Sequence, residues 1–115
     1  MPQKTPLALF ALAALLGGTT PLAAQVQRST LHDFEVVTVA EGLVNPWSMA
    51  WLPNGDMLIT ERPGRLRIVR DGVLLPEAVS GVPEVLARGQ GGLFDVLPHP
   101  DFANNNLIYL SYSRP

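Results

Sequence analysis

The chain has 115 residues, a formal net charge of −2 and no cysteine. The lack of cysteine excludes a disulfide framework and a lipid-modified cysteine within these residues. Eight basic against ten acidic residues give no positive surface of the kind that binds nucleic acid. The roughly 90 residues after position 24 would bury only about 60–65% of the surface of their unfolded chain as a single domain, which is near the lower limit for independent stability.

The N-terminus is typical of a secretory signal peptide. Lys4 precedes the apolar run 7–16, and the small residues Ala23 and Ala24 lead into polar Gln25. A bilayer-spanning helix needs about 20 apolar residues, whereas this shorter run matches the hydrophobic core of a signal peptide. We therefore predict that residues 1–24 are a cleavable signal peptide. The mature protein is expected to be periplasmic or secreted, without stable insertion in the membrane.

After a polar leader, 25–33, short apolar runs alternate with turn signals, which is typical of an all-β fold. Pro53-Asn54-Gly55-Asp56 and Asp71-Gly72 are hairpin turn sequences. Alternation along 65–70 places Leu66 and Ile68 on one face and the arginines on the other. No part of the mature chain has a convincing helical period. The expected strands are 34–39, 47–52, 57–60, 65–70, 73–75, 94–97 and 107–112.

An internal repeat favours one all-β architecture. The same pattern occurs at Leu52-Pro53 and at Leu97-Pro98: an apolar strand ends in Leu-Pro, a turn follows, and a second apolar strand comes after the turn. These steps are about 45 residues apart, and four-stranded propeller blades repeat at about 40–50 residues. The spacing favours one propeller blade and the opening of the next, and two unrelated hairpins of a sandwich are the alternative. Because strand 107–112 lies near the C-terminus with an uncovered edge, we expect residues 34–115 to be the N-terminal part of a larger propeller.

Gln90 is the main candidate for a binding residue. It lies within Gly89-Gln90-Gly91-Gly92, where glycine allows close approach of a ligand and unusual backbone conformations. The glutamine amide both donates and accepts hydrogen bonds, as a sugar hydroxyl requires. No Gly-Lys-Ser/Thr follows, so the segment is not a phosphate loop. The alternative is a simple turn before a strand.

Other polar and aromatic residues have structural interpretations. We expect His99 to be a turn residue bonded to nearby backbone or to Asp101, and His32 to have no specific role. Glu61 and Arg62 follow a predicted strand, and we interpret them as a salt bridge or a solvated pair. Trp47 and Trp51 share one strand face and are interpreted as core residues, with a sugar-stacking platform as the alternative.

Among the acidic residues, Asp95 lies in an apolar strand and needs a partner if it is buried. The turn residues Asp56, Asp71 and Asp101 form no dense oxygen-ligand loop for a metal.

Taken in order, these motifs resemble the start of the soluble aldose and glucose/sorbosone dehydrogenases. The similarity runs from about Val36 to Ser113. Single motifs are generic, but their order and spacing are specific, and the segment from Gly89 to Phe102 is the most diagnostic. The motifs are 43–47, 52–62, 64–66, 82–85, 89–93 and 99–102.

The resemblance implies a six-bladed propeller, of which this chain forms the first blade and up to half of the next. It implies that the complete protein binds pyrroloquinoline quinone near its axis, uses calcium, and oxidises the C1 hydroxyl of an aldose to a lactone, passing electrons to an acceptor. It also implies that Gln90 lies in the sugar pocket. His99 does not match the family's proton-abstracting histidine.

By the same resemblance, the catalytic base, the quinone-holding residues and the calcium ligands are expected beyond Pro115, so this chain alone should be inactive. A non-catalytic propeller module that binds sugar or protein, and a lactone hydrolase on a similar propeller, are the alternatives.

Overall fold

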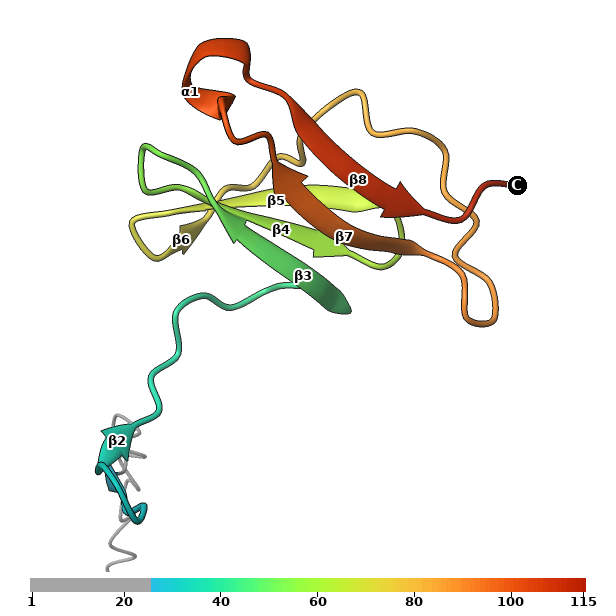
Figure 1. Ribbon diagram of the computed structural model, residues 1–115. Helices are drawn as coiled ribbons and strands as arrows, with labels where there is room; N and C mark the ends of the chain where they lie inside the picture. The colour runs from blue at the N-terminus through green and yellow to red at the C-terminus, as the bar shows by residue number, and fades with distance from the viewer. Residues whose placement is uncertain (1–25) are drawn as a thin grey trace, which may run out of the picture. The chain divides into compact units, whose positions relative to one another are not determined.

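The computed structural model describes residues 26–115 (Figure 1). The predicted signal peptide therefore lies outside the described residues. The chain divides into two units, with the boundary between Val36 and Val37. In the first unit, β1 (Val26–Gln27) and β2 (Phe34–Glu35) form an antiparallel ladder. All further elements belong to the second unit. No helix in the described part is long and apolar enough to cross a membrane.

A four-stranded antiparallel sheet forms most of the second unit. Its strands follow one another in chain order: β3 (Pro46–Trp51), β4 (Met57–Glu61), β5 (Arg65–Arg70) and β6 (Val73–Leu74). Both predicted hairpin turns are present. Gly55 has a φ of 89° between β3 and β4, and Asp71 and Gly72 have φ of 50° and 77° between β5 and β6. Two consecutive residues with positive φ form the tight hairpin turn that suits the twist of paired strands.

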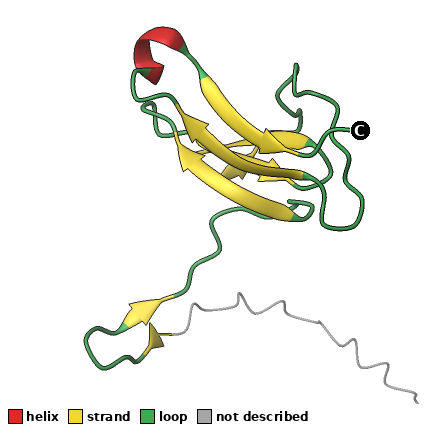
Figure 2. Ribbon diagram, turned by 45° about the vertical axis from the view of Figure 1, so that its right-hand side comes forward, coloured by secondary structure: helices red, strands yellow, loops and turns green. Residues whose placement is uncertain are grey.

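A second sheet consists of β7 (Leu93–Pro98) and β8 (Ile108–Tyr112), which are antiparallel. The connection between them contains a one-turn helix, α1 (Phe102–Asn105). This helix departs from the predicted absence of helices, because a single turn is too short to produce a helical period. Strand β7 packs against β3 and β4, so the two sheets are stacked face to face (Figure 2).

Apolar residues cover both faces of the four-stranded sheet, and all five residues of β4 are buried. On the face toward the second sheet, Leu58 and Leu66 pack with Val96. On the other face, a second cluster packs against the segment that precedes β3; it contains Met57, Ile59 and Val69, with Ala40, Leu43 and Leu74. The central strand β4 is buried on both faces, and the second sheet stacks on one of them, which fits the arrangement of successive propeller blades. The predicted all-β fold is confirmed.

The expected strand 34–39 is only partly present. Strand β2 ends at Glu35, and Val36, Val37 and Val39 are exposed. A strand is stabilised by a ladder partner, and residues 36–45 have none within the described chain. Ala40 and Leu43 instead contribute side chains to the core.

Candidate functional site

The glycine loop is closed on one side by Ser113, which follows β8. The Gly91 N–H donates to Arg88 O at 2.8 Å and forms the turn itself. The Ser113 hydroxyl accepts a hydrogen bond from the Gly92 N–H at 2.7 Å and donates to Leu86 O at 2.8 Å. The backbone of Ser113 adds a bond from its N–H to Gly92 O and one from the Leu86 N–H to its carbonyl. One short side chain therefore joins both ends of the loop.

Arg62, directly after β4, closes the other side. Its Nε donates to Gly91 O at 3.0 Å and its Nη2 to Gly89 O at 2.5 Å. Its carbonyl accepts from the Leu93 N–H at 2.9 Å, and its own N–H donates to Asn45 O at 2.9 Å. The guanidinium thus bonds the carbonyls on either side of Gln90.

Close packing explains why two loop positions are glycine. A Cβ on Gly91 would lie 2.4 Å from Leu86 O and 2.7 Å from Ser113 Oγ, and a Cβ on Gly92 would lie 2.5 Å from Arg62 Cγ. Real Cβ atoms do not approach other heavy atoms so closely, so larger residues would displace the loop. Gly89 has a φ of 57°, which residues with a side chain rarely adopt. The loop backbone is therefore closely packed, and Gln90 carries its one long side chain between Gly89 and Gly92.

Gln90 lies at the exposed turn of this loop. Its side-chain amide makes no hydrogen bond to any other group within residues 26–115. The amide oxygen and the two amide hydrogens of Gln90 are therefore free to bond a ligand, while Arg62 holds the backbone carbonyls of Gly89 and Gly91 on either side. This geometry fits a polar, hydroxylated ligand. The role predicted for Gln90 in sugar binding remains a prediction.

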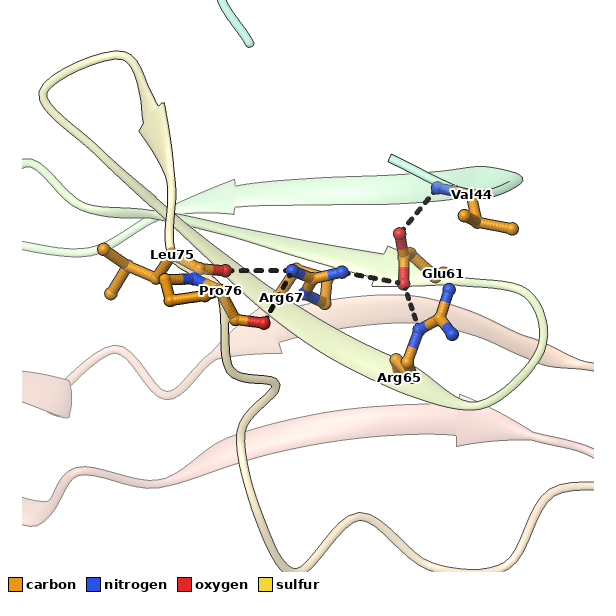
Figure 3. A network of polar contacts seen from close by, with 6 residues as sticks. All are labelled: Val44, Glu61, Arg65, Arg67, Leu75 and Pro76. Atoms are coloured by element: carbon orange, nitrogen blue, oxygen red, sulfur yellow. Dashed lines mark hydrogen bonds and ion pairs between the residues drawn. The ribbon is translucent and has the colours of Figure 1, made fainter. Parts of the chain in front are cut away.

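Glu61 is the centre of a buried polar network at the same end of the sheet (Figure 3). Its side chain is 0% exposed. Its Oε1 accepts from the Val44 N–H at 2.6 Å, and its Oε2 accepts from Arg65 Nε at 2.5 Å and Arg67 Nη1 at 3.5 Å. Arg67 also donates to Leu75 O at 2.9 Å. The network ties together the segment before β3, the β4–β5 hairpin and the segment after β6.

Burial raises the pKa of the Glu61 carboxyl, but the hydrogen bonds from Arg65 and Val44 and the charges of Arg65 and Arg67 outweigh it. The net result is a pKa below the ordinary value of 4.5. The expected salt bridge is present at Glu61, but its partners are Arg65 and Arg67 and not Arg62. Glu61 is buried and paired with Arg65 and Arg67, while Arg62 bonds loop carbonyls.

His99 is a turn residue, as predicted. Its Nδ1 accepts from the Asp101 N–H at 2.9 Å and also contacts Asn105 Nδ2 at 2.9 Å. It follows the end of β7, whereas Gln90 precedes the start of that strand. Six strand residues separate the two positions by about 20 Å. His99 and Gln90 therefore do not share a site.

The acidic candidates have structural partners rather than metal-site geometry. Asp95 is exposed and accepts a hydrogen bond from Ser48 Oγ at 2.5 Å. Asp56 pairs with Arg70 at 2.9 Å and 2.6 Å through its two carboxylate oxygens. The Arg70 hydrogen bond holds the pKa of Asp56 below its ordinary value, against the opposing effect of burial. No group of three or more metal-ligating side chains occurs within residues 26–115.

Trp47 and Trp51, both on β3, are 58% and 61% exposed, and the ring of Trp47 lies beside that of Phe94 in β7, with centroids 5.1 Å apart. With Met49 they line an open groove of about 520 Å³ over the β3–β4 face. Both tryptophans line this groove, but the register of β3 shifts between Pro46 and Ser48, so the shared strand face stays a prediction. The interpretation as core residues is wrong for the described chain. The groove is walled almost entirely by apolar side chains. A sugar site needs convergent polar groups, so we do not assign the sugar to this groove.

Sequence reasoning missed Arg62 and Ser113 as parts of the Gln90 loop. A signal for a donor was present, because three glycines among four residues offer backbone carbonyls but no side chains to bond them. The partners were not identifiable, since they are 29 and 21 residues away along the chain.

The stacked antiparallel sheets fit successive blades of a β-propeller. The family model described as Glucose / Sorbosone dehydrogenase matches residues 43–115. The chain belongs to the glucose/sorbosone dehydrogenase family.

Individual relatives agree with this assignment. Aldose sugar dehydrogenase YliI of Escherichia coli is 51% identical over 80 residues, which are 69% of this chain and 22% of that protein. Quinoprotein glucose dehydrogenase B of Acinetobacter calcoaceticus is 32% identical over 90 residues, 76% of this chain and 19% of that protein. The PQQ-bound structure of aldose sugar dehydrogenase from Streptomyces coelicolor matches with a TM-score of 0.61 at 30% identity, over 79% of this chain and 25% of that one. The chain thus spans about a fifth to a quarter of the length of these relatives.

Proposed function

We propose that the full-length protein oxidises the C1 hydroxyl of an aldose to the lactone, with pyrroloquinoline quinone as the oxidant. Family membership supports an oxidoreductase that acts on sugars, and the PQQ-bound form of the Streptomyces coelicolor neighbour supports the cofactor. Within this chain, the observation that carries the proposal is the exposed, unbonded amide of Gln90, which stands on a loop whose flanking carbonyls are held by Arg62.

Gln90 is proposed to bind the sugar. Its amide carbonyl accepts a hydrogen bond from one sugar hydroxyl, and its NH₂ donates to a second oxygen. Because Arg62 and Ser113 already hold the loop, little backbone ordering has to occur when the sugar binds, and pre-organisation of this kind favours affinity. The role of Gln90 is therefore to orient the sugar so that C1 presents its hydrogen to the oxidant.

The described residues do not by themselves fit either cofactor. They contain no cluster that could hold calcium, and the guanidiniums of Arg62, Arg67 and Arg70 already bond protein groups. Groups outside 26–115 would therefore hold the quinone and the calcium. When bound, the quinone would supply the two-electron oxidant for the C1–H bond, and the proton of the C1 hydroxyl would pass to a base outside this segment.

For the organisation of the chain, we propose that residues 1–24 are removed on export, that 25–33 is a leader, and that 34–115 begins the propeller of a periplasmic or secreted enzyme. N-terminal sequencing of the exported protein tests this, and a product that still begins at Met1 would contradict it.

The experiment is a dye-reduction assay of the purified full-length protein, with and without pyrroloquinoline quinone and calcium, over a panel of aldoses. We expect turnover only when the quinone is supplied. Gln90→Ala should raise KM for the aldose by about tenfold, the effect of losing one or two hydrogen bonds to a neutral ligand, with kcat changed by less than about threefold. Arg88→Lys, in the same loop, is the control.

The two alternatives predict different outcomes. A non-catalytic propeller module would bind sugar or protein without any dye reduction. A lactone hydrolase would consume lactone in the absence of the quinone. Either result would contradict the proposed oxidation.

A further inference from the structure

The guanidinium of Arg62 bonds both backbone carbonyls that flank Gln90. The Arg62 guanidinium donates from Nε to Gly91 O at 3.0 Å and from Nη2 to Gly89 O at 2.5 Å. Its side chain also packs against Gly92, where a Cβ would lie 2.5 Å from Arg62 Cγ. No carboxylate pairs with this guanidinium within the described chain, since Glu61 next to it bonds Arg65 and Arg67. The polar contacts of the Arg62 side chain are therefore directed at the loop.

The loop needs such a tie because of its composition. Glycine loses more conformational freedom on ordering than any other residue, and three of the four residues from Gly89 to Gly92 are glycine. Ser113 fixes the loop at Leu86 and Gly92. It makes no bond to Gly89 or to Gly91, the immediate neighbours of Gln90. Those two positions are fixed from outside the loop by Arg62.

We propose that Arg62 is a positioning residue for sugar binding, which sets the direction of the Gln90 amide by holding Gly89 O and Gly91 O in one planar fork. This inference rests on the proposed function, because it requires Gln90 to bind the sugar. It extends that function by assigning a role to a residue at the end of β4. Arg62 acts through the loop and does not touch the substrate.

The chemistry of the side chain accounts for arginine at this position. Guanidinium presents donors in a rigid plane, so Nε and Nη2 reach two separate acceptors at once. A lysine ammonium is a single point charge on a flexible stem and would hold one carbonyl at a time. Arg62→Lys therefore keeps the charge and removes the fork.

The test compares three single variants of the full-length protein: Arg62→Lys, Gln90→Ala and the control Arg88→Lys. Arg88 lies in the same loop, is exposed, and its side chain has no hydrogen-bond partner among residues 26–115. For Arg62→Lys we expect a KM for the aldose raised by about tenfold, a kcat within about threefold of wild type, and an unchanged midpoint of thermal unfolding. Arg88→Lys should match wild type.

Amide hydrogen exchange gives a readout that does not depend on the sugar. The Gly91 N–H, bonded to Arg88 O, should exchange roughly tenfold faster in Arg62→Lys, because the turn opens more often. A uniform increase over β3 to β8, with a lower unfolding midpoint, would show a general structural role and overturn the proposal. If Arg62→Lys does not fold, Arg62→Gln, which retains one donor group, replaces it with the same expectations.

A double variant separates this inference from the proposed function. In the Gln90→Ala background, Arg62→Lys should raise KM by less than about twofold, because residues that act through one another are not additive. Full additivity, or an Arg62→Lys variant that matches Arg88→Lys while Gln90→Ala raises KM, would overturn the positioning role alone. An unchanged KM in Gln90→Ala would instead contradict the proposed sugar role of Gln90, and with it this inference.

Discussion

Replacing Glu61 by glutamine should destabilise the protein severely, although Glu61 touches neither the glycine loop nor a ligand. The carboxylate is 0% exposed and accepts hydrogen bonds from the Val44 N–H, Arg65 and Arg67. The Arg67 side chain is only 11% exposed, and its Nε has no partner among the described residues. In Glu61→Gln the Arg67 guanidinium would remain buried without a counter-charge.

The expected loss is about 3 kcal/mol in the free energy of unfolding, the low end for breaking a buried ion pair on one side. The low end applies because the Arg65 side chain is 45% exposed and regains water. The assay is urea denaturation of the full-length protein followed by tryptophan fluorescence. Glu84→Gln, an exposed carboxylate in a loop, is the control and should change stability by less than about 0.5 kcal/mol. If both variants unfold at the same urea concentration, the reasoning on Glu61 is refuted.

Three further predictions follow from the described contacts. The pKa of the Glu61 carboxyl is below its ordinary value of 4.5. Its contribution to stability is therefore complete above about pH 5 and is lost as the pH falls through the folded-state pKa. The wild-type protein should lose stability below pH 4.5 more steeply than Glu61→Gln, and parallel acid-unfolding curves would contradict this. Leu66→Ala, in the core between the sheets, should cost about 2–5 kcal/mol in urea denaturation, against less than about 1 kcal/mol for Val73→Ala at an exposed position. Gly92→Ala should raise KM for the aldose as Arg62→Lys does, since its Cβ would displace the Arg62 side chain; a KM equal to that of wild type would mean that the loop tolerates the methyl group.

The strands and hairpins from β3 to β8 follow from local sequence. Local patterns predict these elements without knowledge of the fold, because each acts over a few residues. They are the alternation of Leu66 and Ile68 and the turn residues Gly55 and Asp71-Gly72. The repeated Leu-Pro step predicts a second sheet beginning near residue 94, and β7 begins at Leu93. The residues of segment 36–39 favour a strand, but a strand also needs a partner, which local sequence does not supply.

The polar features depend on tertiary contacts and are less predictable. Glu61 ends β4 at a position that the local sequence predicts to be solvated, yet its carboxylate is buried and bonded by the Val44 N–H, Arg65 and Arg67. Gln90 is identifiable from its glycine neighbours. The groups that hold its loop are not, because Arg62 and Ser113 are brought to it only when β4, β7 and β8 pack together.

Product analysis tests the central proposal most directly. The full-length protein is loaded with pyrroloquinoline quinone and calcium, given an aldose labelled with ¹³C at C1 and an artificial acceptor, and followed by NMR. We predict that the anomeric C1 signals are replaced by a lactone carbonyl signal, with two electrons delivered to the acceptor for each sugar consumed. Unchanged C1 signals with the quinone bound would contradict the proposal that this family member is a quinone-dependent aldose dehydrogenase.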